Sequence, residues 1–226
     1  MSGGSREAVS AAQKGRKVND KLKGLGEGQR PALIAVEVQN RMTNPEYTDS
    51  NRRGLMEQVV SRGIIGKINT LADAFRAEGH PVIFATIVAR PGFEGFKVNC
   101  RLAAQLIQNG QLVDGNPAAR VNDNLRIAST DIIAIRRNGM SIFTGTDMDS
   151  ILRGFGIETV VLAGVSTNIA LPSSAAEAIG LGYNVVLAED CSAGGSAETH
   201  EMQITKHLPF LATIASSSEI ATAIGG

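Results

Sequence analysis

Gly164-Val165-Ser166-Thr167-Asn168-Ile169-Ala170 is the stretch around which the chain is organised. The apolar run Thr159–Ala163 leads into it, and the helix-forming run Ser173–Leu181 leads out of it. This order is typical of a buried strand, a tight turn and the start of a helix. Because such a turn points free backbone N–H groups at whatever lies above it, the stretch predicts a site for an anion or a polarised oxygen.

Further apolar runs of strand length alternate with helical patterns along the whole chain. Continuous apolar runs are typical of parallel strands that are buried on both faces. The expected strands are residues 32–36, 82–87, 131–135, 159–165, 184–188 and 211–215, and the expected helices are residues 51–78, 101–108, 147–153, 168–181, 197–208 and 217–224. The alternation predicts an α/β fold, a doubly wound parallel sheet of about six strands with helices on both faces.

Residues 1–30 differ in composition from the rest of the chain. They hold seven Lys or Arg residues and three acids, a charge of +4, which leaves −4 for the remainder because the formal net charge is zero. We therefore expect a polar, basic N-terminal arm over residues 1–30, with a helix over Arg6–Leu22, and one domain over residues 31–226. The arm is interpreted either as a solvated extension or as a segment that wraps a partner subunit.

The overall composition restricts the class of partner. The zero net charge argues against nucleic acid or a membrane surface as the main partner, since either would favour a basic face, and the absence of Trp leaves no visible aromatic stacking platform. No apolar run reaches membrane-spanning length, and the N-terminus has no signal-peptide core. The two cysteines, Cys100 and Cys191, form no disulfide framework, so a cytoplasmic location is expected.

Three stretches, in this order, carry a resemblance to a known family. They are Ala32–Asn40, Arg137–Asp147 and Gly164–Ala170. The first resembles an apolar run followed by Asp, an apolar residue, Gln and Asn; the second resembles a segment that runs from a catalytic Lys to Ser-x-Phe-x-Gly-Thr; the third resembles a Gly-Val-x-Thr-Asp/Asn-x-Cys loop. Together they resemble the isochorismatase-like (cysteine hydrolase) superfamily over about residues 31–220, which implies a hydrolase.

The positions of that family's Asp–Lys–Cys triad hold different residues here. They are Glu37, Arg137 and Ala170, so the chain has no thiol at the position of the family nucleophile. An engineered Cys-to-Ala change would account for Ala170 alone, whereas natural divergence accounts for all three positions. Because strand residues alternate, Arg136 is expected to face away from the site that Arg137 enters.

The resemblance leaves two roles open for Glu37. Isochorismatases similar to this chain carry a small residue at the nucleophile position and use the strand-one acid as a proton donor, so Glu37 is a candidate general acid. A close Glu37–Arg137 pair would instead favour an ionised Glu37, hence a general base or an ion pair without a catalytic role.

Backbone groups of the loop are expected to survive the substitutions. The resemblance implies an oxyanion site built from the backbone around Val165, Ser166 and Ala170, and a cis Val165–Ser166 peptide bond. Side chains that are candidates for substrate binding are Gln39, Arg90, Phe93, Phe96 and Asn168. Other interpretations remain open for these residues: Gln39 either orients Glu37 or caps the turn, and the loop residues Arg90, Phe93 and Phe96 either bind a carboxylate and line a pocket or pack on the surface.

Neither a metal nor a nucleotide cofactor is expected. Thr86–Arg90 lacks the Asp-x-His-x-x-His ligands that zinc-binding relatives carry after strand two, and no Gly-rich phosphate fingerprint follows the first strand. The sequence thus predicts a cofactor-free hydrolase of a small, carboxylated molecule, cleaved at a C–O (enol or vinyl ether) or activated C–N bond, and self-associated as a homodimer or homotetramer. The alternative is a catalytically silent binding or assembly protein on the same scaffold.

Overall fold

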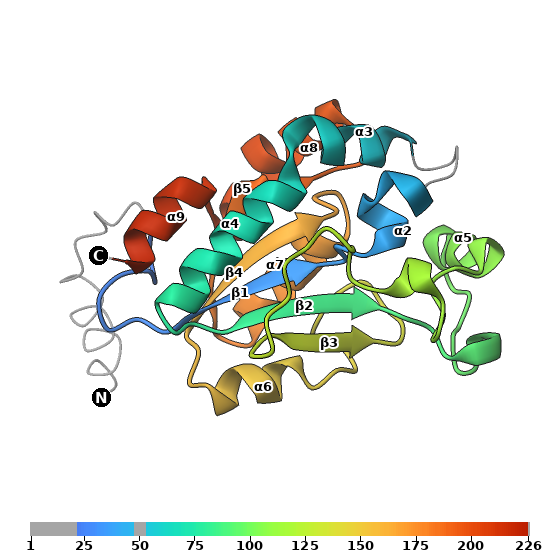
Figure 1. Cartoon of the computed structure of the whole chain (residues 1–226), viewed down its shortest axis with the longest axis horizontal. Coiled ribbons are helices and arrows are strands. Elements are labelled where there is room, and N and C mark those ends of the chain that lie inside the picture. The colour runs from blue at the N-terminus through green and yellow to red at the C-terminus, as the bar shows by residue number, and fades with distance from the viewer. Residues whose placement is uncertain (1–21, 48–52, 226) are drawn as a thin grey trace, which may run out of the picture.

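A computed structural model describes residues 22–47 and 53–225. Within these residues the chain forms one sheet of six parallel strands in the order β3-β2-β1-β4-β5-β6 (Figure 1). The strands are β1 Pro31–Val36, β2 Val82–Ile87, β3 Ile132–Arg136, β4 Thr159–Val165, β5 Asn184–Ala193 and β6 Thr213–Ala215. The predicted fold class, a doubly wound parallel α/β sheet, is confirmed.

The helices follow the predicted alternation, with differences at their ends. They are α2 Asn40–Thr43, α3 Arg53–Arg62, α4 Ile64–Ala77, α5 Arg101–Asn109, α6 Met148–Gly154, α7 Ala170–Gly180, α8 Ala197–Met202 and α9 Ser217–Ile224. The expected helix 51–78 is divided at Gly63, whose φ of 62° lies in the left-handed region. The expected helix 197–208 changes at Gln203–His207 to a π turn, and β5 continues five residues beyond its predicted end.

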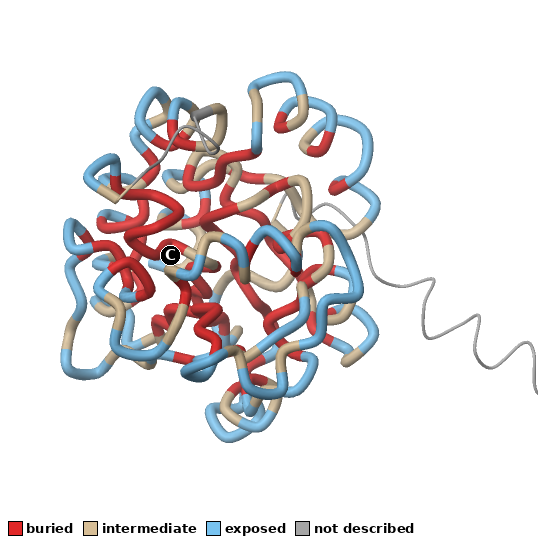
Figure 2. The backbone as a smooth tube through the Cα atoms, turned by 90° about the vertical axis from the view of Figure 1, so that its right-hand side faces the viewer, coloured by how far each residue is buried: buried red, intermediate tan, exposed pale blue. Residues whose placement is uncertain are grey.

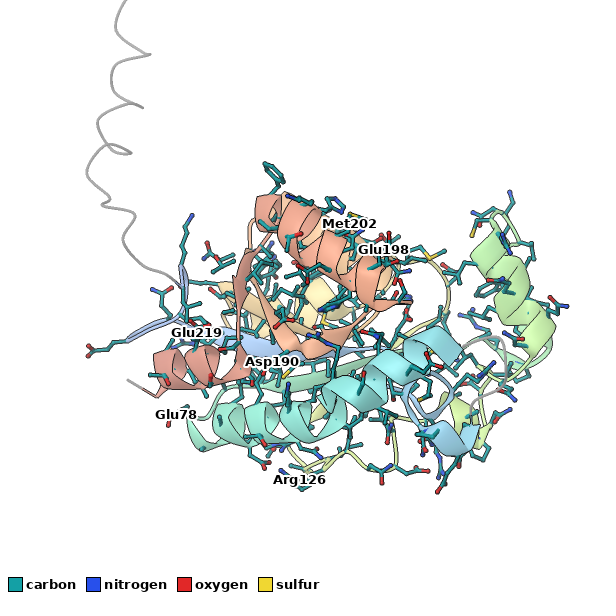
Figure 3. All side chains as sticks on the ribbon, turned by 90° about the horizontal axis from the view of Figure 1, so that it is seen from above. Glu78, Arg126, Asp190, Glu198, Met202 and Glu219 are labelled. Carbon is teal, nitrogen blue, oxygen red and sulfur yellow. The ribbon has the colours of Figure 1, made fainter. Side chains whose placement is uncertain are left out.

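Helices lie on both faces of the sheet, and β1, β2 and β4 are buried between them. On one face Ile68, Leu71 and Phe75 of α4 pack with Ile220 of α9 against the sheet. On the other face Leu152 of α6, residues of α7 and Leu208 pack against the alternate side chains of the same strands. Figure 3 shows α8, which carries the labelled Glu198 and Met202, on the opposite side of the sheet from α4, and Figure 2 shows that the buried residues lie along the middle of the molecule.

The direction in which successive strands are added to the sheet reverses between β1 and β4, although all the strands are parallel. From β1 the sheet continues to β2 and β3 on one side, and to β4, β5 and β6 on the other. Ligands of open α/β sheets bind at such a switch point, outside the carboxyl ends of the strands. Gly164 lies at this junction with a φ of 104°, and a Cβ there would collide with the backbone of Val36, so the glycine lets the two strand ends lie close together.

The described end of the predicted arm, residues 22–30, lies on the domain. Leu22 and Leu25 pack against the core, and the carbonyl of Gly24 accepts a 2.7 Å hydrogen bond from Thr159 Oγ1. Residues 1–21, with almost all of the predicted helix Arg6–Leu22, lie outside the described residues. In the part of the chain that is described, no helix is both long and apolar enough to cross a membrane.

Candidate active site

A cavity of about 890 Å³ lies at the carboxyl edge of the sheet, at the β1/β4 switch point. Its walls include Glu37, which follows β1, and Arg136, which ends β3. The opposite wall is the loop after β4, with Val165, Ser166 and Ala170. Residues more than 130 positions apart in the sequence therefore meet in one cavity, as the sequence predicts for Glu37 and the loop.

Glu37 and Arg136 form an ion pair on the cavity wall. The Arg136 side chain is 3% exposed and the Glu37 side chain 14%. Glu37 has a φ of 51°, in the left-handed region that a β-strand residue does not adopt, so the strand turns sharply at this residue. Non-glycine residues held in this region concentrate at functional sites.

Arg136 has more hydrogen-bond donors than the protein satisfies. Its Nη2 donates to Glu37 Oε1, while Nε and Nη1 are buried without a partner among the described residues. A buried guanidinium with free donors is costly, because each donor loses its water and gains nothing in exchange. The free donors of Arg136 therefore suit an acceptor that comes from outside the chain.

The structure corrects the expected roles of the two arginines. Arg137, the sequence candidate, turns away from the cavity and donates to Asp114 Oδ2 at 2.6 Å and to the carbonyl of Val88 at 3.1 Å. Alternation along β3 does separate the two side chains. However, Ala134 and Arg136 point inward while Ile133 and Ile135 are partly exposed, so Arg136 has the inward position that was expected for Arg137.

The loop after β4 presents backbone donors to the cavity. The Val165–Ser166 peptide bond is cis, as the resemblance predicts. Ala170 is the first residue of α7, is 2% exposed, and follows an N-cap residue that makes no side-chain hydrogen bond. Within the described residues, the N–H groups of Ser166 and Ala170 donate to no protein acceptor. These two groups remain available to stabilise negative charge.

Gln39 is a structural residue and not part of the cavity wall. It is fully buried, and its amide bridges Ile87 and the segment Pro117–Ala119. The Nε2 atom donates to the carbonyls of Ile87 and Ala119, at 3.1 and 2.6 Å, and Oε1 accepts from the N–H of Ile87 at 2.8 Å. The prediction that Gln39 binds substrate is therefore wrong, because its hydrogen-bonding groups are occupied by the backbone.

The other predicted binding residues divide into two groups. Phe96 and Asn168 line the cavity, and Asn168 Oδ1 also accepts a 3.0 Å hydrogen bond from the N–H of Gly195. Phe93 packs edge-on against Phe96, with ring centroids 6.3 Å apart, and supports the wall from behind. Arg90 is exposed and lies outside the cavity lining. Arg90 and Phe93 are thus not direct wall residues.

Sequence reasoning missed the positive charge of the cavity. Of the described lining residues, three are cationic, namely Arg136, Lys97 and Arg101, and one, Glu37, is acidic. Lys97 and Arg101 are exposed on the loop before α5 and at its start. Their signal is weak in the sequence, because exposed cations in a loop are ordinary surface residues until the fold brings them to a cavity.

The sequence of this chain matches the model of a known protein family. The family model described as "Isochorismatase domain" matches residues 31–219. This chain belongs to the isochorismatase family. The uncharacterized isochorismatase family protein YecD of Escherichia coli is 34% identical over 169 residues, which cover 71% of this chain and 83% of YecD. A ureidoacrylate amidohydrolase, RutB of Rhizobium rhizogenes, is 28% identical over 71% of this chain and 69% of its own length.

Solved structures agree on the isochorismatase fold. A cysteine hydrolase from Pseudomonas syringae pv. phaseolicola superimposes with a TM-score of 0.74 at 20% identity, over 87% of this chain and 92% of that chain. Members of the isochorismatase family are hydrolases. Among the described residues of this member, no group of three or more His, Cys, Asp or Glu side chains could hold a metal ion.

Proposed function

We propose that this family member hydrolyses a small carboxylated substrate without a cysteine nucleophile, with Glu37 as the general acid or base. The bond is either the C–O bond of an enol or vinyl ether or an activated C–N bond. The observation that carries the proposal is the buried guanidinium of Arg136, which has free Nε and Nη1 donors in the wall that also holds Glu37.

The free donors of Arg136 match a carboxylate. A guanidinium presents parallel N–H groups to a carboxylate through Nε with Nη2 or through Nη1 with Nη2, so each free donor of Arg136 can bind one oxygen while the second hydrogen of Nη2 binds the other. Such charge-assisted hydrogen bonds are about twice as strong as neutral ones. Lys97 and Arg101 add positive charge to the same cavity, which favours entry of an anion. A substrate carboxylate would thus complete a site that the chain leaves incomplete.

Glu37 supplies the proton-transfer group. Its carboxylate accepts a hydrogen bond from Arg136, so it is ready to take a proton from a water molecule that attacks a carbonyl carbon. For an enol ether the order is reversed: a protonated Glu37 gives its proton to the carbon, water adds to the resulting oxocarbenium ion and returns a proton to Glu37, and the hemiketal then breaks its C–O bond to release the alcohol. The second route requires Arg136 to turn from Glu37 to the substrate.

The loop after β4 would stabilise the charge that develops. As water adds to a carbonyl carbon, negative charge moves to the carbonyl oxygen, and the N–H groups of Ser166 and Ala170 have no competing acceptor among the described residues. Donors held in place before the reaction act without reorganisation, and losing one such donor costs about 10²–10³-fold in kcat in other enzymes. The methyl group of Ala170 leaves room for water where the family has a thiol.

The name of one relative suggests where to begin the search for a substrate. Ureidoacrylate amidohydrolase is named for a substrate that carries a carboxylate. A panel of carboxylated amides and enol ethers, with ureidoacrylate and isochorismate among them, tests both bond types. We expect turnover of at least one compound, and a decrease in kcat of about 10²–10⁴-fold for Glu37→Gln. The control Glu57→Gln changes an exposed acid of α3 and should leave kcat unchanged. Equal kcat for wild type and Glu37→Gln would contradict the proposal.

A silent binding or assembly protein is the second candidate. Two observations favour it: a methyl group occupies the nucleophile position, and Glu37 is held in an ion pair. Such a protein would turn over no compound of the panel, yet would bind one of the acids tightly by calorimetry. Turnover that disappears in Glu37→Gln and persists in Glu57→Gln would exclude this candidate.

We also propose a homodimer or homotetramer in the cytoplasm. The edge strand β3 supports self-association, because Ile133 and Ile135 are 43% and 42% exposed on its outer face. The arm of residues 1–30 is either a solvated extension or a segment that wraps the partner. Light scattering of the full chain and of a chain without residues 1–21 would distinguish these roles.

A further inference from the structure

A chain of buried polar side chains lies behind the loop that forms one wall of the cavity. Thr167 is fully buried between Ser166 and Asn168, both of which line the cavity. Its Oγ1 lies 3.2 Å from Nδ1 of His200, and Nε2 of His200 lies 3.3 Å from Oε1 of Glu189. These residues come from the loop after β4, from α8 and from β5, so the contacts join three separate elements.

Glu189, the last of these three side chains, is held by Arg62 of α3. Arg62 donates to the carboxylate of Glu189, to the Glu189 carbonyl at 3.0 Å and to the Ser192 carbonyl at 2.9 Å. The neighbouring charges and hydrogen bonds, that of His200 first, lower the pKa of Glu189 to about 2. Glu189 is therefore a carboxylate, and it can only accept hydrogen bonds.

The direction of each hydrogen bond follows from that charge. Nε2 of His200 must carry the hydrogen, because its partner on Glu189 has none to give. In the neutral ring Nδ1 is then an acceptor, and it takes the hydrogen of the Thr167 hydroxyl. The carboxylate of Glu189 thus determines the orientation of the Thr167 hydroxyl through the ring of His200.

Close packing leaves the loop little freedom to move. The N–H of Thr167 donates to the Ala193 carbonyl at 3.0 Å. A Cβ built on Gly194 would lie 2.6 Å from Thr167 Oγ1 and 3.2 Å from the His200 backbone, so only glycine fits between the two side chains. The loop is held from behind on several sides, while its front faces the cavity.

We propose that Thr167, His200 and Glu189 form a positioning relay that fixes the backbone donors of Ser166 and Ala170 in the cavity. The inference deepens the proposed function, since it takes this loop as the wall that stabilises charge. The three residues do not touch the substrate; they act through the loop. Displacement of a catalytic group by about 1 Å costs on the order of 10²-fold in rate, which is the reason for such a relay.

The test needs no substrate. The variant Ala170→Cys introduces a thiol at the start of α7, where helix N–H groups favour the reactive thiolate. In this background we expect Thr167→Val and His200→Gln to slow alkylation by iodoacetamide roughly tenfold, and Thr167→Ser to retain the parent rate. The control His207→Gln changes a histidine of the adjacent π turn whose Nδ1 contacts Gln203 Oε1 at 2.7 Å, and it should leave the rate unchanged.

A second measurement uses the wild-type chain. Long-range ¹H–¹⁵N NMR of the histidine rings distinguishes the two neutral tautomers. The relay predicts that His200 carries its hydrogen on Nε2. An Nδ1–H tautomer, or folded Thr167→Val and His200→Gln variants that alkylate at the parent rate, would overturn the proposal. Because neither measurement involves turnover, failure of the proposed hydrolysis would leave both results interpretable.

Discussion

Two arginine–carboxylate pairs lie near the cavity, and they are completed to different degrees. In the pair behind the loop, Arg62 donates to the Glu189 carboxylate and to two carbonyls, and Glu189 also accepts from His200. In the cavity pair, Arg136 reaches Glu37 through one nitrogen and leaves Nε and Nη1 without partners. The incomplete pair is also the more deeply buried one, with 3% exposure of Arg136 against 24% of Arg62.

This difference indicates which pair is for structure and which is for a ligand. Buried polar groups in native proteins nearly always have partners, so a buried exception requires an explanation. In the Arg62–Glu189 pair, donors and acceptors find their partners within the protein, and the pair holds the loop in place. The Glu37 pair has more donors than acceptors, and in the proposed function a substrate carboxylate completes it. The following changes test the cavity that holds the incomplete pair, each of the two pairs, and the neighbouring Arg137.

The largest effect is expected where the two walls of the cavity join. Gly164→Ala puts a Cβ against the backbone of Val36 at a φ of 104°, so β1 and β4 must separate or the chain must carry the strain. We expect a decrease of roughly 3 kcal/mol in the free energy of unfolding, measured by urea denaturation. Gly180→Ala is the matched control, because it lies in α7 with nothing within 4 Å of the new Cβ. A Gly164→Ala variant as stable as the control would disprove the close approach.

Removal of the Arg136 guanidinium, which has two donors without partners, should produce the next largest effect. Arg136→Gln takes away the donors that a substrate carboxylate would meet, and we expect KM or Kd for the best compound of the panel to rise about 10²-fold. Arg136→Lys keeps the charge but not the parallel N–H groups, so its value should lie between those of Arg136→Gln and wild type. Titration calorimetry measures both variants. Unchanged affinity in Arg136→Gln would mean that the free donors do not bind the ligand.

The sequence was sufficient for the parts of the molecule that depend on local pattern. Apolar runs such as Ala32–Val36 define strands, and the alternation of strands and helices predicts the doubly wound parallel sheet, whereas the strand order with its switch point at β1 and β4 comes from the structure. That Glu37 and Ala170 line one cavity agrees with the family resemblance, which matches both to positions of one triad. The loop around Ser166 was also predicted with its cis peptide bond, but that came from family resemblance.

The rest depends on contacts between distant segments. The inward position of Arg136 is set by the pairing of β3 with β2, where Arg136 lies opposite Ile87, and this register has no local signal around residue 136. Gln39 was misassigned because its partners, Ile87 and Ala119, lie 48 and 80 residues away. His200 is not among the sequence candidates, yet it is buried against Thr167 and Glu189, which lie far from it in the sequence.

The contacts of Glu189 with Arg62 and His200 lead to a prediction about stability in acid. Since the pKa of Glu189 falls from 4.5 to about 2 on folding, its carboxylate stabilises the folded state fully above pH 4.5. That contribution is lost as the pH falls from 4.5 towards 2, where both states are protonated. The difference in unfolding free energy between wild type and Glu189→Gln should therefore shrink over this pH range in urea titrations. A difference that stays constant from pH 5 to about 3 would contradict the assigned contacts.

The smallest effect is expected at the arginine that the family pattern favoured. Arg137 pairs with Asp114 at 2.6 Å, but the two side chains are 31% and 38% exposed, and exposed pairs contribute about 0–1 kcal/mol. Arg137→Gln should therefore change the free energy of unfolding by about 0.5 kcal/mol or less, and KM for the carboxylated compound not at all. Denaturation and kinetics beside Arg136→Gln measure both. If KM rose in Arg137→Gln and not in Arg136→Gln, the position of the family lysine would outweigh the geometry of β3, and the contrast between the two ion pairs would lose its functional meaning.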